Sequence, residues 1–95
     1  MLIHLFVKGR VQGVGFRAFV QKKATQLDLS GWVRNRINGC VELMLDGEPD
    51  KINAFLKDCQ RGSYFSRVDA LQPVSVPDAP VMPIEKGICR ILATV

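Results

Sequence analysis

The sequence predicts an α+β domain, with a mostly antiparallel sheet of four to five strands and two helices on one face of the sheet. Two segments carry apolar residues at the helical spacing of three and four, and the segments around them alternate apolar and polar residues. The resulting order is strand, helix, strand, strand, helix, strand, the split β-α-β pattern. Because 95 residues provide one hydrophobic core, residues 1–95 are expected to form a single domain.

The first half of the chain predicts a strand, a glycine-rich loop and a helix. Leu2–Lys8 places apolar side chains at alternate positions, as a half-buried strand does. Gly9–Gly15 contains three glycines, which indicates unusual backbone angles or close approach to another group. The apolar residues that follow recur every three or four positions, which predicts a helix over Phe16–Leu29 that Ser30-Gly31 ends.

The middle of the chain predicts a hairpin and a second helix. Trp32-Val33 resumes strand composition, and Val41–Leu45 alternates apolar and polar residues. Asn38-Gly39 lies between them, and both residues tolerate the positive φ angles of a hairpin turn. A second helix is expected to begin at Glu48-Pro49-Asp50, where proline and acidic residues suit a helix N-terminus, and to end near Arg61-Gly62.

The last part of the chain predicts two further strand segments. Val68–Val76 has a broken strand pattern, and Gly87–Val95 is expected to be the last strand. Prolines in and after the first segment disfavour a helix or a central strand there: Pro73, Pro77, Pro80 and Pro83.

Composition and charge limit the classes of partner. The formal charge of +4 favours anions, but the cations are scattered and the longest run is Lys22-Lys23, so a nucleic acid is not favoured. The apolar run Leu2–Val7 is too short for a signal peptide or a membrane span, so no membrane association is expected. The chain has no obvious surplus of apolar residues, and we expect a monomer.

The cysteines predict free thiols rather than a disulfide or a metal site. They are widely spaced, form no Cys-x-x-Cys pair and have no histidine cluster nearby: Cys40, Cys59 and Cys89. Free thiols are typical of a reducing compartment, so a cytoplasmic location is expected.

The glycine-rich loop has features of an anion-binding turn. Gly13-Val14-Gly15 followed by Ala18 imitates a dinucleotide-binding motif, but Arg34-Asn35-Arg36 stands where that motif needs an acidic residue. No Gly-Lys-Ser/Thr follows the glycines, so the nucleotide phosphate-loop motif is also missing. What remains is a helix N-terminus behind glycines, where backbone N–H groups can hold an anion. The alternative is a plain tight connection.

Arg17 and Asn35 are the candidate functional side chains. Arg17 lies in the first turn of a helix, where a cation is unfavourable unless an anion is bound, and its guanidinium can chelate phosphate oxygens. Asn35 ends a strand, and it is either a turn-forming residue, the commoner case, or a carboxamide that holds a water molecule. The single histidine, His4, is expected to be structural or at the surface rather than a base.

The sequence offers no acid–base machinery. It contains no evident pair of carboxylates and no Ser-His-Asp set, so any reaction must need little proton transfer from the protein. Acyl phosphates meet this condition, because the leaving carboxylate has a pKa of about 4 and departs without a proton. Catalysis is then mainly positioning and stabilisation of charge on the phosphoryl oxygens.

Three motifs closely resemble those of the acylphosphatases: Lys8–Arg17 (KGRVQGVGFR), Gly31–Asn35 (GWVRN) and Asn38–Glu42 (NGCVE). The resemblance implies a ferredoxin-like fold and hydrolysis of acyl phosphates to a carboxylate and inorganic phosphate, without a metal or cofactor. It implies that Arg17 binds the phosphate and that Asn35 orients the attacking water. Inorganic phosphate or sulfate is then expected to compete with the substrate. The resemblance also assigns phosphate binding to backbone N–H groups, those of Gln12, Gly13, Val14, Gly15 and Phe16.

The resemblance is good over residues 2 to about 70, and the sequence departs from the family pattern at four places. Asp28 replaces the usual glycine between two leucines at the end of the first helix, and Gly62-Ser63 replaces a Gly-Pro pair. A proline-rich stretch occupies Pro73–Pro83, and Cys89 stands where a phenylalanine is typical of the last strand.

Two other functions remain open. A related domain with a similar Gly-Val-Gly-Phe-Arg loop opens large carbamoyltransferases of hydrogenase maturation, so the chain could be an ancillary module of that kind. An RNA-binding domain has the same strand order, but it stacks bases on aromatic residues of central strands. The strand Cys40–Leu45 has no aromatic residue, and Phe6 stands alone on the first strand.

Overall fold

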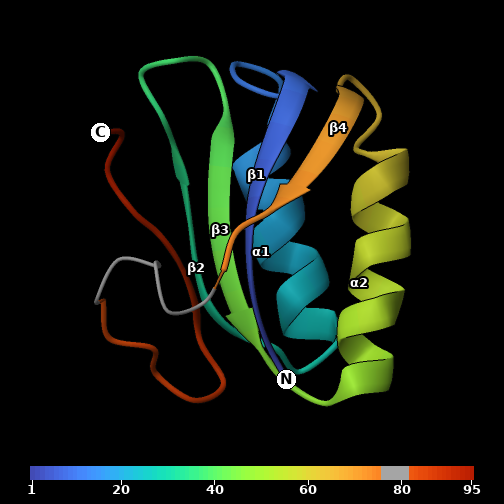
Figure 1. The fold of residues 1–95 in the computed structure, drawn as a ribbon, viewed down its shortest axis with the longest axis vertical. Coiled ribbons are helices and arrows are strands. Elements are labelled where there is room, and N and C mark those ends of the chain that lie inside the picture. The colour runs from blue at the N-terminus through green and yellow to red at the C-terminus, as the bar shows by residue number, and fades with distance from the viewer. Residues whose placement is uncertain (76–81) are drawn as a thin grey trace.

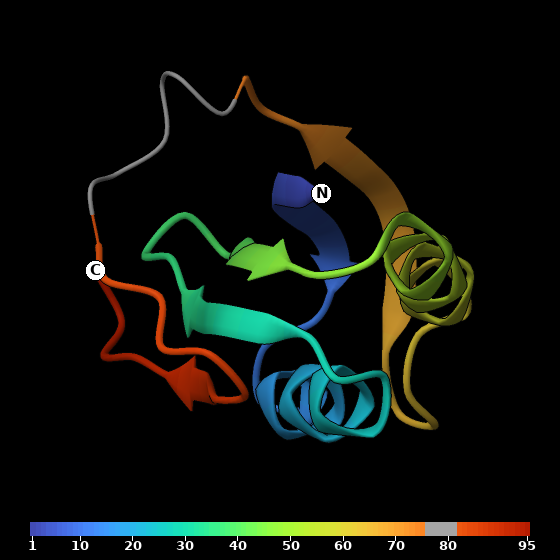
Figure 2. The same ribbon diagram turned by 90° about the horizontal axis from the view of Figure 1, so that it is seen from below.

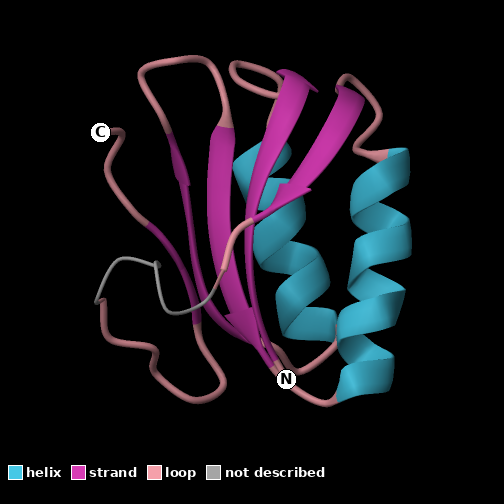
Figure 3. Ribbon diagram, viewed as in Figure 1, coloured by secondary structure: helices cyan, strands magenta, loops and turns pink. Residues whose placement is uncertain are grey.

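A computed structural model describes residues 1–75 and 82–95 as a five-stranded sheet with two helices on one of its faces (Figures 1 and 3). The elements in chain order are β1 (Leu2–Arg10), α1 (Phe16–Gln26), β2 (Ser30–Asn35), β3 (Val41–Asp46), α2 (Pro49–Arg61), β4 (Arg67–Pro73) and β5 (Cys89–Ile91). The predicted class and element order are therefore confirmed.

The sheet has the strand order β4-β1-β3-β2-β5, with β3 at its centre. The pairs β1–β3, β1–β4 and β2–β3 are antiparallel, whereas β2 and β5 are parallel. Seen from below, both helices lie on the same side of the sheet (Figure 2). Neither helix among the described residues is long and apolar enough to cross a membrane.

The apolar stripes found in the sequence form the core between the sheet and the helices. Alternate residues of the strands and every third or fourth residue of the helices point into the same layer, as the two periodicities require. Fully or nearly fully buried residues of this layer include Leu5, Val7, Phe16, Val20, Ala24, Val33, Val41, Leu43, Leu45, Ile52, Phe55 and Cys59.

Helix α1 ends earlier than predicted, at Gln26 rather than Leu29. Asp28 has a φ of 58°, in the left-handed region, and this turns the chain out of the helix. The prediction that Ser30-Gly31 stops the helix was wrong, because both residues belong to β2. A Cβ on Gly31 would lie 1.8 Å from the carbonyl oxygen of Met44, so a glycine is needed for β2 to approach β3.

Strand β1 is longer than predicted, because it continues through Gly9 and Arg10. This extension pairs with β4, and the register shifts between Lys8 and Gly9. A Cβ on Gly9 would lie 2.1 Å from the carbonyl oxygen of Arg67. The first glycine of the predicted loop therefore allows close strand pairing, and the loop itself begins after Arg10.

The C-terminal strands are shorter than predicted. The segment expected over Val68–Val76 is β4, Arg67–Pro73, and its last predicted residue lies outside the described residues, as do Pro77 and Pro80. The strand expected over Gly87–Val95 is only Cys89–Ile91. Beyond it the chain stays beside β2 through isolated hydrogen bonds, from Leu92 N to Val33 O at 2.9 Å and from Val95 N to Asn35 O at 3.2 Å.

The left-handed backbone conformation of Asp28 is expected to lower the stability of the fold. Asp28→Gly is expected to raise the free energy of unfolding by about 0.5–1 kcal/mol, because glycine adopts a positive φ without strain and removes a negative charge from a helix C-terminus. Asp28→Asn is the matched control, since it removes the charge but keeps a Cβ. Urea denaturation of the three proteins measures the difference. A full gain from Asp28→Asn would contradict backbone strain as the cause.

Candidate active site

The loop between β1 and α1 owes its shape to two glycines. Gly13 has a φ of 72° and Gly15 a φ of 77°, both in the left-handed region that other residues adopt at a cost. A Cβ at either position would meet no atom within 4 Å, so backbone conformation rather than lack of space requires glycine here. Gly15 is the N-cap of α1, and no side chain of the described residues caps this helix end.

The N–H groups of this loop have no bonding partner within residues 1–75 and 82–95. Within the described residues, no hydrogen bond has the N–H of Gln12, Gly13, Val14 or Gly15 as its donor. The N–H groups that open α1, beginning with Phe16, have no preceding carbonyl to bond, as at any helix N-terminus. Together with the partial positive charge of the helix end, these donors form a potential anion site.

A small cavity of about 190 Å³ brings this loop together with both candidate side chains. It is lined by Val11, Gly13, Gly15, Phe16, Arg17, Ala18, Asn35 and Ile91. Ligand pockets commonly measure about 300–1,000 Å³, so this cavity suits a group of phosphate size rather than a large ligand. Two larger hollows of about 820 and 830 Å³ contain neither Arg17 nor Asn35.

Arg17 is the cationic side chain of this cavity. It is half-buried in the first turn of α1, and within the described residues it makes neither an ion pair nor a side-chain hydrogen bond. A guanidinium near free backbone N–H groups adds a positive charge and further hydrogen-bond donors to the site, and both favour an anion. The loop, Arg17 and Asn35 were all predicted from sequence, and the structure places them around one cavity.

Asn35 is the last residue of β2, and its side chain lines the cavity. Its Oδ1 is buried and has no hydrogen-bond partner among the described residues. The turn-forming role is filled by Asn38 instead, whose Oδ1 accepts a hydrogen bond from Cys40 N at 3.1 Å. The two asparagines of this region therefore differ: Asn38 makes the turn, whereas Asn35 lines the cavity and its Oδ1 has no hydrogen-bond partner in the described residues.

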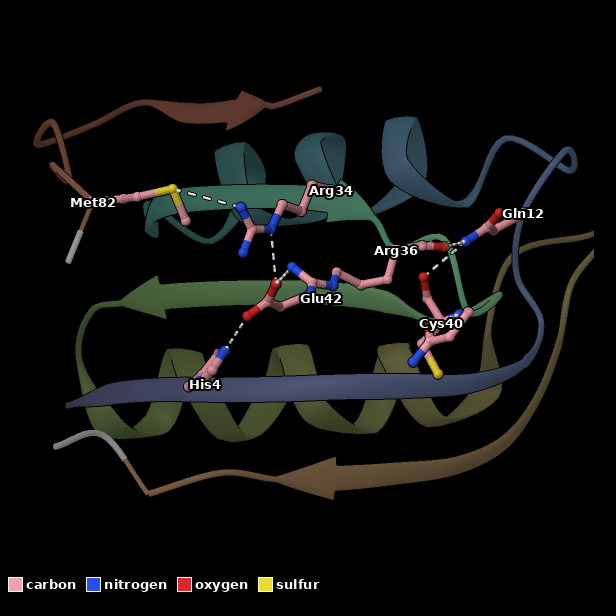
Figure 4. Close-up of polar contacts among 8 residues, drawn as sticks. His4, Gln12, Arg34, Arg36, Cys40, Glu42 and Met82 are labelled. Carbon is pink, nitrogen blue, oxygen red and sulfur yellow. Dashed lines mark hydrogen bonds and ion pairs between the residues drawn. The ribbon is translucent and has the colours of Figure 1, made fainter. Parts of the chain in front are cut away.

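Sequence reasoning missed one residue that lines the cavity, Ile91, and one side-chain contact beside it, made by Gln12. Ile91 lines the cavity from β5. The sequence pattern predicted only that Gly87–Val95 forms a strand, and it did not indicate which of these residues reaches the cavity. The side chain of Gln12 donates two hydrogen bonds, to Arg36 O at 2.7 Å and to Cys40 O at 2.9 Å (Figure 4). A polar residue inside a glycine loop is a weak signal of such a contact.

A second polar cluster lies on strands β1, β2 and β3 and at the start of the β2–β3 hairpin, around the buried carboxylate of Glu42 (Figure 4). Its Oε2 lies 2.6 Å from His4 Nε2, and its Oε1 accepts hydrogen bonds from Arg34 Nε at 2.7 Å and Arg36 Nη1 at 3.4 Å. The Arg34 guanidinium also lies 5.1 Å from the centre of the Trp32 ring. His4 is thus buried and paired, as expected for a structural histidine, and it does not line the cavity.

The three cysteines are free, and burial distinguishes them. Cys59 and Cys89 are buried, and burial raises the pKa of Cys59 to about 12 and that of Cys89 to about 11. Cys40 is only half-buried and lies in the hairpin between β2 and β3.

Comparison with known proteins gives consistent matches. The acylphosphatase family model matches residues 3–81. The chain is 47% identical over 75 residues to an acylphosphatase of Bacillus pumilus, which covers 79% of this chain and 83% of that protein. It is 39% identical over 84 residues to an acylphosphatase of Geobacillus thermodenitrificans, covering 88% and 86% of the two chains.

Solved structures agree with these sequence matches. The crystal structure of acylphosphatase from Bacillus subtilis superposes with a TM-score of 0.82 at 35% identity, covering 97% of this chain and 99% of that one. The crystal structure of HypF from T. kodakarensis superposes with a TM-score of 0.77 at 29% identity, but only 12% of that chain is covered.

The thiols should differ in reactivity. At pH 8 a disulfide reagent is expected to modify Cys40 in the folded protein, whereas Cys59 and Cys89 should react only after unfolding, because their pKa values lie well above this pH and burial blocks access. Spectrophotometric counting of released thiolate, with and without denaturant, tests this. Cys40→Ser should abolish the reaction of the folded protein, and two or more reactive thiols in the native state would contradict the assignment.

Proposed function

Because this chain belongs to the acylphosphatase family, we propose that it hydrolyses its substrate in the cavity lined by Arg17 and Asn35. The chain is an enzyme that converts an acyl phosphate and water into a carboxylate and inorganic phosphate. Its substrate is a small molecule that contains a carboxyl–phosphate anhydride.

The reaction balances without an acid or base from the protein. The bond that breaks joins phosphorus to the acyl oxygen, and the bond that forms joins phosphorus to the oxygen of water. An acyl phosphate dianion and water give a carboxylate and dihydrogen phosphate, so both protons of the water end on the phosphate product. Because the carboxylic acid has a pKa of about 4, the carboxylate leaves unprotonated.

The phosphate group is proposed to lie against the loop between β1 and α1. The backbone N–H groups of Gln12 to Phe16 donate to its oxygens, and Arg17 chelates it from the first turn of α1. Three features support this placement. The loop N–H groups have no partner in the described residues, and Gly13 and Gly15 adopt the positive φ angles that shape the loop. Arg17 makes no ion pair with any described residue. These donors also stabilise the charge on the phosphoryl oxygens in the transition state.

The attacking water is proposed to be held by Asn35. Its Oδ1 accepts a hydrogen bond from the water and directs the lone pair of the water oxygen toward phosphorus, opposite the leaving carboxylate. The observation that carries the proposal is that Arg17 and Asn35, whose buried Oδ1 has no partner in the described residues, line one cavity together with Gly13 and Gly15 of the loop. A water on Asn35 would thus lie beside a phosphate on the loop.

Two further properties belong to this proposal. Inorganic phosphate, and sulfate of similar shape, compete with the substrate, because the site binds the phosphate end common to all acyl phosphates. The enzyme works in the cytoplasm, which is supported by three cysteines that form no disulfide.

The alternative is an ancillary module of a carbamoyltransferase-type hydrogenase-maturation protein. The match to HypF supports it only over 12% of that protein, whereas 99% of the Bacillus subtilis acylphosphatase is matched. An assay of benzoyl phosphate hydrolysis by the isolated chain separates the two. Turnover supports the enzyme, and a rate equal to that of buffer supports the module.

Replacement of Arg17 tests the phosphate site. Arg17→Ala is expected to lower kcat/KM by about 10²–10³-fold or more and to weaken inhibition by inorganic phosphate, because a fixed transition-state donor is lost. Arg17→Lys should retain part of the activity, since it keeps the charge but not the bidentate geometry. Lys22→Ala, which removes an exposed cation of the same helix, is the control. Unchanged turnover in Arg17→Ala would reject the site.

Replacement of Asn35 tests the water-holding role. Asn35→Ala is expected to lower kcat by about 10²-fold while the inhibition constant of inorganic phosphate changes by less than about threefold, because the phosphate donors remain in place. Asn53→Ala, at an exposed position of α2, is the control. If phosphate inhibition were lost together with kcat, Asn35 would be a phosphate ligand or a structural residue instead.

A further inference from the structure

We propose that Gln12 is a positioning residue: its side-chain amide fixes the phosphate loop relative to the end of β2, where Asn35 lies. The inference rests on the proposed function, since it concerns the distance between a phosphate on the loop and a water on Asn35. The backbone N–H of Gln12 is one of the proposed phosphate donors. The side chain of the same residue has a separate task, which is to hold that loop in place.

The contact is made with the hairpin that joins β2 to β3 (Figure 4). Gln12 Nε2 donates to Arg36 O at 2.7 Å and to Cys40 O at 2.9 Å. Arg36 directly follows Asn35 in the chain, so the first bond is made one residue beyond the proposed water holder. The two acceptors are 24 and 28 residues away from Gln12, so the contact joins parts of the chain that are distant in sequence.

The chemistry of the two acceptors fixes the orientation of the amide. Both are backbone carbonyls, which only accept hydrogen bonds, so the NH₂ end of Gln12 must face them. Each carbonyl already accepts one backbone bond within the hairpin: Arg36 O from Gly39 N at 3.1 Å, and Cys40 O from Arg36 N at 2.8 Å. Gln12 therefore donates to the remaining lone pair of each carbonyl oxygen, and both of its amide protons are bonded to the hairpin.

Within the described residues, no other hydrogen bond joins the loop at residues 11–15 to the hairpin at residues 35–41. The pairing of β1 with β3 ends at Val7 and Val41, and the following residues of β1 pair with β4 instead. Between residues 11–15 and the hairpin at residues 35–41, the bonds from Gln12 are the only ones within the described parts of the chain. The loop that binds phosphate and the strand end that holds water are thus tied by one side chain.

Such a tie is expected to affect the chemical step more than binding. In-line attack requires the reacting atoms to be about 3–3.5 Å apart and aligned, and a displacement of about 1 Å can lower the rate 10²-fold. The loop N–H groups and Arg17 would still meet the phosphate after loss of the tie, because they belong to one short segment. Loss of the Gln12 amide should therefore lower kcat and leave phosphate affinity nearly unchanged.

The first measurement compares Gln12→Met, which keeps the length of the side chain but has no donor, with wild type. We expect kcat for benzoyl phosphate to fall about 10–100-fold. KM and the inhibition constant of inorganic phosphate should change by less than about threefold. Should Gln12→Met not fold, Gln12→Asn serves the same purpose, because it keeps the amide on a stem one methylene too short to reach both carbonyls.

Gln21→Met is the matched control. Gln21 Nε2 also donates to a backbone carbonyl far away in sequence, Cys89 O at 2.8 Å, but this bond joins α1 to β5. Loss of this bond should lower the denaturation midpoint to a similar degree as loss of the Gln12 bonds, with kcat within about twofold of wild type. An equal fall of kcat in both variants would show a general effect of stability and would overturn the proposal.

The decisive measurement is a double-mutant cycle with Asn35→Ala. If Gln12 acts by placing Asn35, Gln12→Met should lower kcat by less than about twofold once the carboxamide of Asn35 is gone. Independent effects that multiply would overturn the inference and leave the proposed function intact, as would wild-type kcat in Gln12→Met. Wild-type kcat in Asn35→Ala alone would instead reject the water-holding role, and the positioning role with it.

Discussion

The buried carboxylate of Glu42 is the interaction on which the arrangement of the sheet depends. It lies on β3, the central strand, and its partners come from both sides of that strand: His4 from β1, Arg34 from β2, and Arg36 from the hairpin just after β2. A buried charge left without partners costs about 3–5 kcal/mol. Because a shift of either neighbouring strand by one residue would remove these partners from that face, the carboxylate helps to fix the register of both strands.

The position of the candidate site follows from this register. Arg34 and Arg36 flank Asn35 and bind the carboxylate on one face of the sheet. Because successive residues of a strand point to opposite faces, the side chain of Asn35 points the other way, toward the cavity at the start of α1. Glu42 is not among the residues that line the cavity. By fixing the register of β2, it nevertheless helps to determine which side chain of β2 reaches the cavity.

The sequence predicted most of the fold because the core is encoded by local periodicity. Every predicted helix and strand exists, and the structure places Arg17 and Asn35 around one cavity. The errors occur where tertiary contacts override local patterns. Gly31 looked like a helix stop but allows β2 to approach β3, and the left-handed Asp28 ends α1 early. The last strand was predicted too long, since its length depends on how far it can follow β2.

The pairings of polar side chains could not be predicted in the same way. The partners of Glu42 become neighbours only once three strands are in register, and in that register Arg34 lies directly opposite Glu42. The contact of Gln12 depends on the turn of a remote hairpin, which exposes two carbonyl oxygens toward the loop. Periodicity identifies buried faces, whereas hydrogen bonds between distant loops depend on the assembled structure.

The chemistry explains why positioning matters so much in this small site. The leaving carboxylate needs no proton and the protons of the water end on phosphate, so a catalytic residue with an adjusted pKa offers little advantage. Arg17 is accordingly the single charged side chain among the residues that line the described cavity. What the protein must supply is a fixed distance between the phosphate and the water. In the proposed mechanism, that distance is set by backbone conformation at Gly13 and Gly15, by strand register at Asn35, and by the bonds from Gln12 that join these two regions.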